Sequence, residues 1–313
     1  MQILLYLGVF IVSLAVLLKA ADWFIDAAEE IGLSLGISPF IIGVTIIAFG
    51  TSLPELATSI ASVFAGTSQI VIGNVVGSNI TNIALVLGVT VVVVKEIKLH
   101  DQIWHIDMPF LLSSAFLLWF LVQDQNVSIF EAFIFLAALV VFLVYSLKSE
   151  DHEDDVYRTK VSWKSYVWLV VGGTLVWLGA EYTIFAITKL SVLMGVSSEI
   201  IALSFVALGT SLPEVIVSLG AARKGKTSIA VGNVLGSNIF NTYAVMGIPA
   251  FFGDLNIPQN VLDFSLPLMI VMTILFAVMT ISRRITRWEG IILLIFYVFY
   301  MVELFTKSPP PAG

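Results

Sequence analysis

The segment AFGTSLPE at Ala48–Glu55 returns as ALGTSLPE at Ala207–Glu214, each time inside a long apolar run. Of the 313 residues, 58% are hydrophobic and 12% are charged, and the mean hydropathy is +1.01. Soluble domains carry about 25% charged residues. Because apolar runs of about 18 or more residues recur along the chain, it is predicted to be an all-α polytopic membrane protein.

Ten transmembrane helices are predicted, separated by turn-forming or charged stretches. The first span has no basic segment before it and has an internal counterpart in the second half of the chain, so we expect a membrane helix rather than a signal peptide. The predicted bounds are 3–27, 37–65, 70–94, 103–122, 128–148, 165–189, 196–222, 227–252, 260–281 and 288–306.

An internal repeat relates the two halves of the chain. Equivalent residues lie 159 positions apart without a gap from Asp22 and Glu181 through Gly88 and Gly247 (181 − 22 = 247 − 88 = 159). The segments GNVVGSNITNIALVLG and GNVLGSNIFNTYAVMG agree at ten of sixteen positions. Since five spans make an odd number, the second half is predicted to enter the membrane from the opposite side, which gives two inverted five-helix repeats, a transporter architecture.

The predicted domain boundaries follow from the repeat and from one hydrophilic stretch. The first five-helix repeat covers 1–148, a cytoplasmic hydrophilic linker covers 149–164, and the second repeat covers 165–313 with a disordered C-terminal tail. The linker is acidic but lacks the Asp/Gly pattern of an EF-hand loop, so we interpret it as a solvated connector rather than a calcium site. Twelve of the fifteen Lys and Arg residues lie in loops after odd-numbered spans, which predicts that both termini lie outside the cytoplasm.

The repeated motif places two energetically costly groups side by side in the membrane. Pro54 has no N–H and cannot donate to the carbonyl of Gly50, and an unpaired carbonyl in hydrocarbon costs several kcal/mol. The next residue, Glu55, adds a carboxylate that costs about 3 kcal/mol or more at the bilayer centre. A bound cation accounts for both features. The candidate ligands from the two copies are the carboxylates of Glu55 and Glu214 and the hydroxyls of Thr51, Ser52, Thr210 and Ser211.

A second polar motif follows the first in each half. Asn74, Ser78 and Asn82 lie at i, i+4 and i+8 and therefore share one helix face. Their equivalents are Asn233, Ser237 and Asn241, and Ser59 and Ser218 extend the polar stripe beyond each glutamate. Two GxxxG pairs predict close approach to the broken helices. These oxygens suit Ca²⁺, which takes about 6–8 oxygen ligands, and regrouped they suit several Na⁺ ions. The alternative is that they serve as interhelical contacts beside kinks, but two copies in register favour a cation site.

The paired stretches AFGTSLPE…GNVVGSNITN and ALGTSLPE…GNVLGSNIFN resemble the two α-repeats of the sodium/calcium exchanger family, within the calcium/cation antiporter superfamily. The resemblance covers nearly the whole chain. It implies that ions are held among spans 2, 3, 7 and 8, and that the long, loosely packed spans 1 and 6 slide to open the site to each side. It implies Ca²⁺ binding by Glu55 and Glu214 with the backbone oxygens of Thr51 and Thr210. It implies Na⁺ sites from Ser52, Ser211, Ser78, Ser237 and the carbonyls of Ala48 and Ala207, with Asn82 and Asn241 flanking the centre.

The resemblance implies an antiporter that exchanges Ca²⁺ for Na⁺ across the cell membrane by alternating access. Proton-coupled relatives usually have a shorter glutamate motif, whereas the sodium-type form occurs here twice. An H⁺-coupled exchanger, or one for another divalent cation such as Mg²⁺ or Mn²⁺, remains the alternative. Potassium-dependent relatives carry Asp where this chain has Asn241, which argues against potassium co-transport.

Other classes of function fit the sequence less well. The three histidines, His100, His105 and His152, lie in predicted loops or at the very start of a predicted span, and neither HExxH nor GxSxG occurs, so we expect no enzyme. A cation channel would more naturally use a ring of subunits than an internal repeat. The expected partners are Ca²⁺, Na⁺ (H⁺ in the alternative) and the lipid bilayer, with no cofactor, no nucleic acid and a monomeric chain. Asp22 is expected to pair with Lys19 or to lie exposed at the membrane interface.

Overall fold

A computed structural model describes residues 2–99, 107–148, 161–194 and 211–307, and these residues are mostly helical. Within these ranges, six helical segments are long and apolar enough to cross a membrane. They are Gln2–Ser34, Pro39–Phe64, Gln69–Val94, Ile129–Lys148, Trp163–Leu193 and Val261–Thr280. A shorter apolar helix covers Asp107–Leu121, and residues 195–210 of the predicted seventh span lie outside the described part of the chain. The protein is therefore a helical membrane protein with several spans.

The described part of the first half contains long helices, two short strands, and short helices that join into longer, locally irregular spans. They are α1 (Gln2–Ser34), α2 (Pro39–Ile42), η1 (Gly43–Ile47), α3 (Ala48–Thr51), α4 (Leu53–Phe64), α5 (Gln69–Thr81), η2 (Asn82–Leu87), α6 (Gly88–Val94), β1 (Glu96–Lys98), α8 (Asp107–Leu121), β2 (Asn126–Val127) and α9 (Ile129–Lys148).

The described elements of the second half follow a similar order. They are α10 (Trp163–Leu193), α12 (Leu212–Arg223), α13 (Thr227–Phe240), η3 (Asn241–Val245), η4 (Pro249–Phe251), β3 (Leu255–Asn256), η5 (Val261–Ser265), α14 (Leu266–Thr280), β4 (Arg284–Thr286) and α15 (Arg287–Lys307). The bounds of α4 and α12 differ by 159 at both ends (212 − 53 = 223 − 64 = 159), as do those of α8 and α14 (266 − 107 = 280 − 121 = 159).

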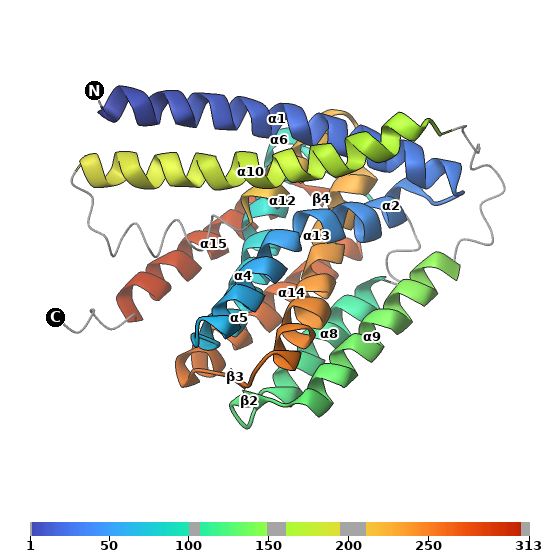
Figure 1. Cartoon of the computed structure of the whole chain (residues 1–313). Helices are drawn as coiled ribbons and strands as arrows, with labels where there is room; N and C mark the ends of the chain where they lie inside the picture. Colours follow the sequence, from blue (N-terminus) through green and yellow to red (C-terminus); the bar gives the residue numbers. More distant parts are fainter. Residues whose placement is uncertain (1, 100–106, 149–160, 195–210, 308–313) are drawn as a thin grey trace.

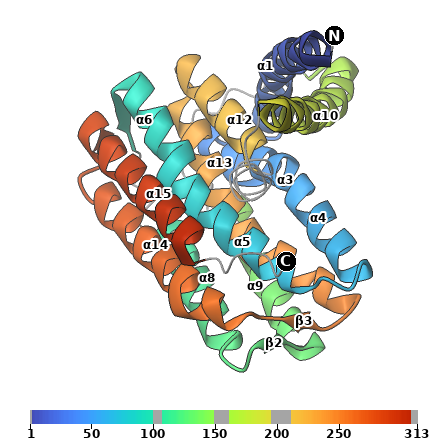
Figure 2. The same cartoon turned by 90° about the vertical axis from the view of Figure 1, so that its left-hand side faces the viewer.

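The two longest helices, α1 and α10, lie side by side and run antiparallel across the other helices (Figures 1 and 2). Their contacts fix the direction, because Ser13 meets Thr183 at 3.0 Å between hydroxyl oxygens while Leu17 packs on Gly179. A Cβ at Gly179 would lie 2.9 Å from the Cα of Leu17, so a glycine is needed for this approach. Both helices are long, as expected, but they pack tightly against each other, whereas loose packing was expected.

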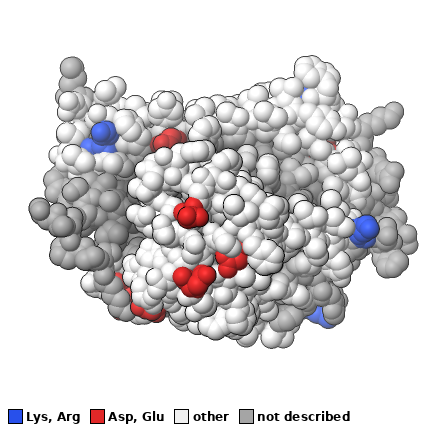
Figure 3. Space-filling view, turned by 60° about the horizontal axis from the view of Figure 1, so that its bottom comes forward, with Lys and Arg blue, Asp and Glu red and all other residues white. Residues whose placement is uncertain are grey.

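Two small antiparallel sheets lie at opposite ends of the molecule (Figure 1). One pairs β1 with β4, with Ile97 opposite Ile285, and the other pairs β2 with β3, with Val127 opposite Leu255. Figure 3 shows acidic side chains on the face at the bottom of Figure 1, where β2 and β3 lie. The acidic residues close to β2 and β3 in the chain are Asp124, Glu131, Asp254 and Asp263. The basic residues in and beside β1 and β4 are Lys95, Lys98, Arg283, Arg284 and Arg287.

Backbone contact between α13 and the α2–η1 segment brings the two halves together. A Cβ at Gly236 would overlap the carbonyl oxygen of Val44, and one at Gly232 would overlap the carbonyl oxygen of Phe40. The close approach predicted from the GxxxG pair is thus confirmed for the second copy. In the first copy, no atom of the described residues lies within 4 Å of a Cβ at Gly73. The equivalent partners of Gly73 and Gly77, 159 residues beyond Phe40 and Val44, fall at positions 199 and 203, outside the described residues.

Candidate cation site

The GTSLPE motif breaks the helix at Ser52 in the first half, and a helix begins just after the equivalent residue, Ser211, in the second. In the first half α3 ends at Thr51 and α4 begins at Leu53, with Ser52 between them at φ −88° and ψ 2°. Ser211, at φ −86° and ψ 3°, precedes α12 in the same way. The proline then occupies the first turn of the new helix, where its missing N–H costs little. The break predicted from the sequence therefore gives each half a helix that begins inside the protein.

Each glutamate lies in the first turn of one of these half-helices. Glu55 on α4 and Glu214 on α12 are both 0% exposed. The N-terminal end of a helix carries a partial positive charge, which stabilises a nearby carboxylate. The Ser52 hydroxyl donates to Oε1 of Glu214 at 3.4 Å, so the break in one half contacts the glutamate of the other. The other oxygen of Glu214, Oε2, has no hydrogen-bond partner among the described residues.

Two equivalent asparagines hold the half-helices against α5 and α13. The Asn74 side-chain amide donates to the carbonyl oxygen of Glu55 and to the Ser59 hydroxyl, both at 3.0 Å. The Asn233 amide donates to the Ser218 hydroxyl at 2.9 Å. The same asparagine–serine contact therefore recurs in the two halves. The amide nitrogens of Asn74 and Asn233 therefore hold α4 and α12 in place. Only the side-chain oxygens of these two asparagines remain as candidate ion ligands.

The hydroxyl of Thr51 joins the first broken helix to α13. It donates to Oδ1 of Asn233 at 3.1 Å, lies 3.4 Å from the hydroxyl oxygen of Ser237, and lies 3.3 Å from the carbonyl oxygen of Ala48. The predicted ligands Thr51, Ser237 and Ala48 are thus neighbours. Ser78 is also buried, at 3% exposure. The remaining two predicted ligands, Thr210 and Ala207, lie outside the described residues.

The two central asparagines each begin a turn of π-helix, a feature that the sequence did not indicate. Asn82 is the first residue of η2 and Asn241 the first of η3, and both are fully buried. Such turns are rare and frequent at functional sites, because they redirect side chains and loosen the backbone ladder. The Asn82 amide nitrogen donates to Oδ1 of Asn238 at 3.1 Å. Neither amide atom of Asn241 has a hydrogen-bond partner among the described residues.

Sequence reasoning missed a second pair of asparagines, Asn79 and Asn238. They are equivalent in the repeat (238 − 79 = 159), and they contact each other: the Asn79 amide donates to the carbonyl oxygen of Asn238 at 3.3 Å and to the Thr242 hydroxyl at 3.0 Å. The centre of the α5–α13 contact is therefore occupied by equivalent residues. The signal was present, because GSN occurs in both copies of the motif.

Several buried oxygens around the breaks have unused hydrogen-bonding capacity. Buried polar atoms in folded proteins are almost always hydrogen-bonded, so unpaired ones call for a ligand or a functional reason. α12 contacts η2, and the equivalent elements α4 and η3 also contact each other, so these atoms lie in one region. The atoms with no partner among the described residues are Ser211 Oγ, Glu214 Oε2, Asn82 Oδ1 and Asn241 Oδ1. All are hard oxygen ligands of the kind that Ca²⁺ and Na⁺ accept.

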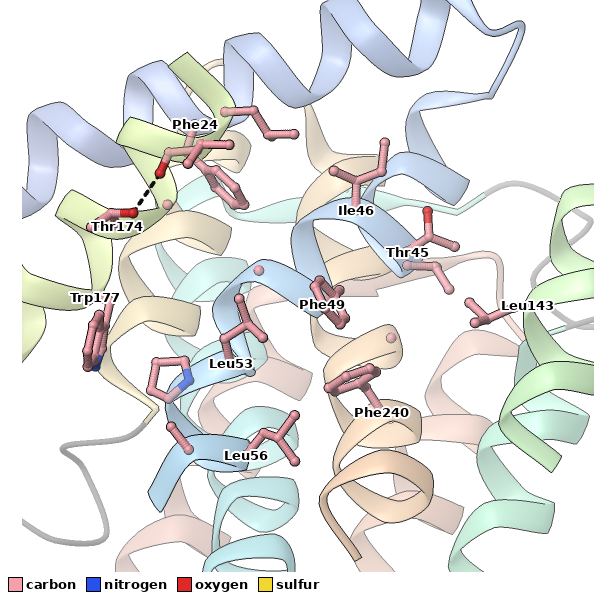
Figure 4. Close-up of a pocket in the computed structure, with 18 of the residues that line it drawn as sticks. Phe24, Thr45, Ile46, Phe49, Leu53, Leu56, Leu143, Thr174, Trp177 and Phe240 are labelled. Atoms are coloured by element: carbon pink, nitrogen blue, oxygen red, sulfur yellow. Dashed lines mark hydrogen bonds between the residues drawn. The ribbon is translucent and has the colours of Figure 1, made fainter. Parts of the chain in front are cut away.

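A larger cavity beside the site has a different chemistry. It measures about 800 Å³ and lies between the α3–α4 segment, α9, α10 and α13 (Figure 4). Phe49, Leu53, Trp177 and Phe240 are among its apolar walls, and the hydroxyl of Thr174 donates to the carbonyl oxygen of Val170. Because its lining is apolar, this cavity offers few ligands for an ion. The candidate ligands for a cation lie instead around Ser52 and Ser211.

The fold and the candidate site together define a class of protein: a helical membrane protein that buries two carboxylates, Glu55 and Glu214, in the first turns of two helices that begin inside it. Comparison with known proteins specifies the family. The profile of the sodium/calcium exchanger protein family matches residues 5–148 and 164–306, once in each half. The chain belongs to this family, and the membership expected from the repeated motif is confirmed.

Individual relatives match over nearly the full length of this chain. The sodium/calcium exchanger MaX1 of Methanosarcina acetivorans is 31% identical over 95% of this chain and 97% of its own length. The inner membrane protein YrbG of Escherichia coli is 28% identical over 98% of both chains. Among solved structures, the sodium-calcium exchanger NCX_Mj, soaked with zero Na⁺ and Ca²⁺, superposes with a TM-score of 0.84 at 29% identity, covering 96% of this chain and 99% of that one.

Proposed function

We propose that this protein is a secondary antiporter that exchanges Ca²⁺ for Na⁺ by alternating access, with the ions bound mid-membrane between Glu55 and Glu214. The observation that carries the proposal is the pair of broken helices that start at Leu53 and Leu212 and each bury a glutamate in their first turn. A buried carboxylate needs a counter-charge. Two of them match one Ca²⁺ or two Na⁺, so either cargo neutralises the same site.

The roles proposed for individual residues follow the family resemblance. Glu55 and Glu214, with the backbone oxygens of Thr51 and Thr210, bind Ca²⁺. The hydroxyls of Ser52, Ser211, Ser78 and Ser237 and the carbonyls of Ala48 and Ala207 complete Na⁺ sites, while Asn82 and Asn241 flank the centre. Support comes from the contacts of Thr51 with Ser237 and of Ser52 with Glu214, which join oxygens from both halves.

The inverted repeat is part of the proposal, with ten spans in halves 1–148 and 165–313 joined by a linker at 149–164. Its support is geometric. The equivalent helices α1 and α10 run antiparallel, as inverted halves require. The two sheets are also related by the repeat. By the offset of 159, β1 corresponds to β3 and β2 to β4. The pair β1–β4 at one end is therefore equivalent to the pair β3–β2 at the other.

The orientation follows from the two ends of the molecule. The positive-inside rule assigns the basic β1–β4 end to the cytoplasm and the acidic β2–β3 end, with both termini, to the outside. The chain has no cysteine, so single cysteines at Arg223 and at Asp124 provide a clean test. An impermeant thiol reagent added to intact cells should label only the Asp124→Cys protein. Labelling of the Arg223 position alone would reverse the orientation and leave the fold unchanged.

The decisive experiment for the coupling ion is ⁴⁵Ca²⁺ uptake into proteoliposomes that contain the purified chain. Separate vesicles are loaded with Na⁺, with K⁺, or with a proton gradient and no Na⁺. We expect uptake only against Na⁺, and we expect it to carry current if more than two Na⁺ exchange for each Ca²⁺. Uptake driven by the proton gradient alone would replace Na⁺ by H⁺ in the proposal. Uptake that needs no counter-ion would indicate a channel.

A further inference from the structure

An ion-pair network joins α1 to the turn between α12 and α13. Lys224 Nζ lies 3.0 Å from a carboxylate oxygen of Asp22 and 2.9 Å from one of Asp26. Lys226 Nζ lies 2.7 Å from Asp26 and 2.6 Å from Glu29. The three carboxylates are at i, i+4 and i+7 and therefore share one face of α1. The expectation that Asp22 pairs with Lys19 was wrong, because Asp22 pairs with Lys224; its side chain is 41% exposed, in agreement with the other expectation.

The network is more than a set of isolated surface pairs. Asp26 binds both lysines, and the side chains of Lys224 and Lys226 are only 26% and 21% exposed. Lys224 also donates to the backbone carbonyl of Asp22 at 3.3 Å. Burial alone would lower the pKa of Lys226, but hydrogen bonds to Asp26 and Glu29 outweigh it and raise the pKa, so this lysine remains charged. The carboxylates of Asp22 and Asp26 are 41% and 57% exposed, so salt can still weaken these pairs.

Among the described residues, the other end of the molecule keeps only one charged counterpart of this network, Glu181, which corresponds to Asp22. By the offset of 159, Asp26 corresponds to Phe185 and Glu29 to Thr188, while Lys224 corresponds to Ala65 and Lys226 to Thr67. None of these four side chains is charged. The halves that match so closely at the cation site therefore differ in how α1 and α10 are attached to the rest of the protein.

The network lies over a buried contact between α1 and α12. Beneath it, Ile25 and Ala28 of α1 pack with Ala221 and Ala222 of α12 in one buried apolar cluster. A displacement of α1 by one helical turn, about 5.4 Å, would move each carboxylate beyond ion-pair distance of its present lysine. Opening this end of the molecule therefore requires that the present pairs break.

We propose that this network is an asymmetric latch that holds α1 against the α12–α13 turn, keeps this end of the molecule closed, and biases the transporter toward the state that is open at the opposite end. The proposal rests on the alternating access proposed above. Because the Ala65–Thr67 turn carries no such lysines, the two closed ends are not equally stable. With the orientation proposed above, the latch closes the cytoplasmic end and favours the outward-open state.

The test measures opening directly, with a cysteine beneath the latch. Ala221 is 0% exposed, so an Ala221→Cys variant of the otherwise cysteine-free chain reports opening by its rate of maleimide labelling. With Lys224→Gln and Lys226→Gln added, labelling should accelerate about three- to tenfold, the size expected when several partly exposed pairs are lost. Added salt should accelerate labelling of the parent and have little effect on the double variant.

The matched control is Glu30→Gln on the same helix. Glu30 accepts hydrogen bonds from the Ser165 hydroxyl at 2.8 Å and the Ser162 backbone at 3.3 Å, so it ties α1 to α10 and not to the latch. Its labelling rate should stay within about twofold of the parent. If Ala221→Cys disturbs folding, as judged by its melting temperature, Ala222→Cys (Ala222 is 4% exposed) serves as the reporter.

Two results would overturn the latch: unchanged labelling after the lysines are neutralised, or equal acceleration in the Glu30→Gln control. Labelling is measured without transported ions, so it does not depend on the Na⁺ or Ca²⁺ assignment. Accelerated labelling in a protein that fails to exchange Ca²⁺ for Na⁺ would refute the proposed function and leave the latch intact.

Discussion

The two halves of this protein are alike in their described contacts at the candidate cation site and unlike where they attach the long helices. Asn74 holds Ser59 in the first half as Asn233 holds Ser218 in the second, at 3.0 and 2.9 Å. By contrast, the lysines that bind α1 at one end have no charged equivalents at the other. A cation needs oxygens from all sides, which favours symmetry at the site, whereas a preferred conformational state needs two ends of unequal stability.

The centre of the molecule shows a smaller difference of the same kind. Asn82 and Asn241 are equivalent, but among the described residues only Asn82 has its amide oriented, by the donor contact to Oδ1 of Asn238. Asn79, the equivalent of Asn238, donates to Asn238 and Thr242 and does not orient Asn241. Near-identical sequences thus produce one fixed and one adjustable amide beside the site.

The largest expected effect tests the symmetry of the two carboxylates. Glu55→Gln and Glu214→Gln each keep the side-chain shape and remove one charge from a site that needs two. ⁴⁵Ca²⁺ exchange in proteoliposomes should fall at least about 100-fold in either variant, the scale of an uncompensated buried charge. Asp254→Asn, in an exposed loop, is the control and should transport normally. Normal exchange in one glutamate variant would mean that the two halves do not contribute equally.

The second prediction compares equivalent glycines in α5 and α13. Gly236→Ala places a methyl group against the carbonyl oxygen of Val44 and should lower the unfolding free energy by about 2–3 kcal/mol. Gly73→Ala meets no described atom within 4 Å and should be neutral, or stabilising by up to about 1 kcal/mol through helix propensity. Thermal unfolding in detergent measures both. Equal destabilisation would indicate that the first copy has an equally close partner.

A third prediction exploits the unequal central asparagines. Asn241→Asp adds a third carboxylate at a site without a fixed partner, and that group must take up a proton or a second cation before Ca²⁺ fits. Between pH 8 and pH 6, the fold-decrease in calcium uptake should be at least about five times larger in the variant than in the parent, because protons compete for the extra group. K⁺ stimulation of the variant is the companion measurement. A pH profile identical to that of the parent would place Asn241 outside the ion site.

The equivalent change at Asn82 should behave differently. Asn82→Asp replaces the amide donor by a carboxylate oxygen that faces Oδ1 of Asn238, so two acceptors meet in a buried position. We expect a loss of about 1–3 kcal/mol in unfolding free energy, with a smaller loss in Asn241→Asp. The same thermal unfolding assay compares them, and equal losses would show that the amide of Asn82 is not fixed by Asn238.

The smallest expected effect concerns the residues that orient the centre. Asn238→Ala frees the amide of Asn82, so the KM for Ca²⁺ should rise about three- to tenfold while the melting temperature changes little. Asn79→Ala removes the hydrogen bonds to Asn238 and Thr242 and should cost about 1 kcal/mol of stability with KM unchanged. A change in KM without a change in stability indicates a positioning residue, and a change in stability without a change in KM indicates a packing residue. Identical behaviour of the two variants would remove the distinction.

Much of the fold and part of the site were predictable from the sequence. Hydropathy and turn residues located most spans to within a few residues, as at the predicted 128–148 and the observed Ile129–Lys148. The proline rule predicted a helix break just before Pro54, which the structure has at Ser52, and the cost of a buried charge identified Glu55 and Glu214 as candidates. These inferences succeed because helix ends, breaks and buried charges depend mainly on the residues within one segment.

Only the tertiary structure decided which segments meet. The partner of Asp22 is Lys224, 202 residues away, instead of the nearby Lys19, whose ammonium lies 5.7 Å from the ring centroid of Trp23. The hydrogen bond that orients Asn82, and the carbonyl against which Gly236 packs, likewise come from distant segments. Such contacts depend on the rotation and crossing of whole helices, which a periodic pattern leaves undetermined. The sequence alone therefore determined the repeated motifs of the candidate site and their place in apolar helices, and the packing of distant helices decided the asymmetry around them.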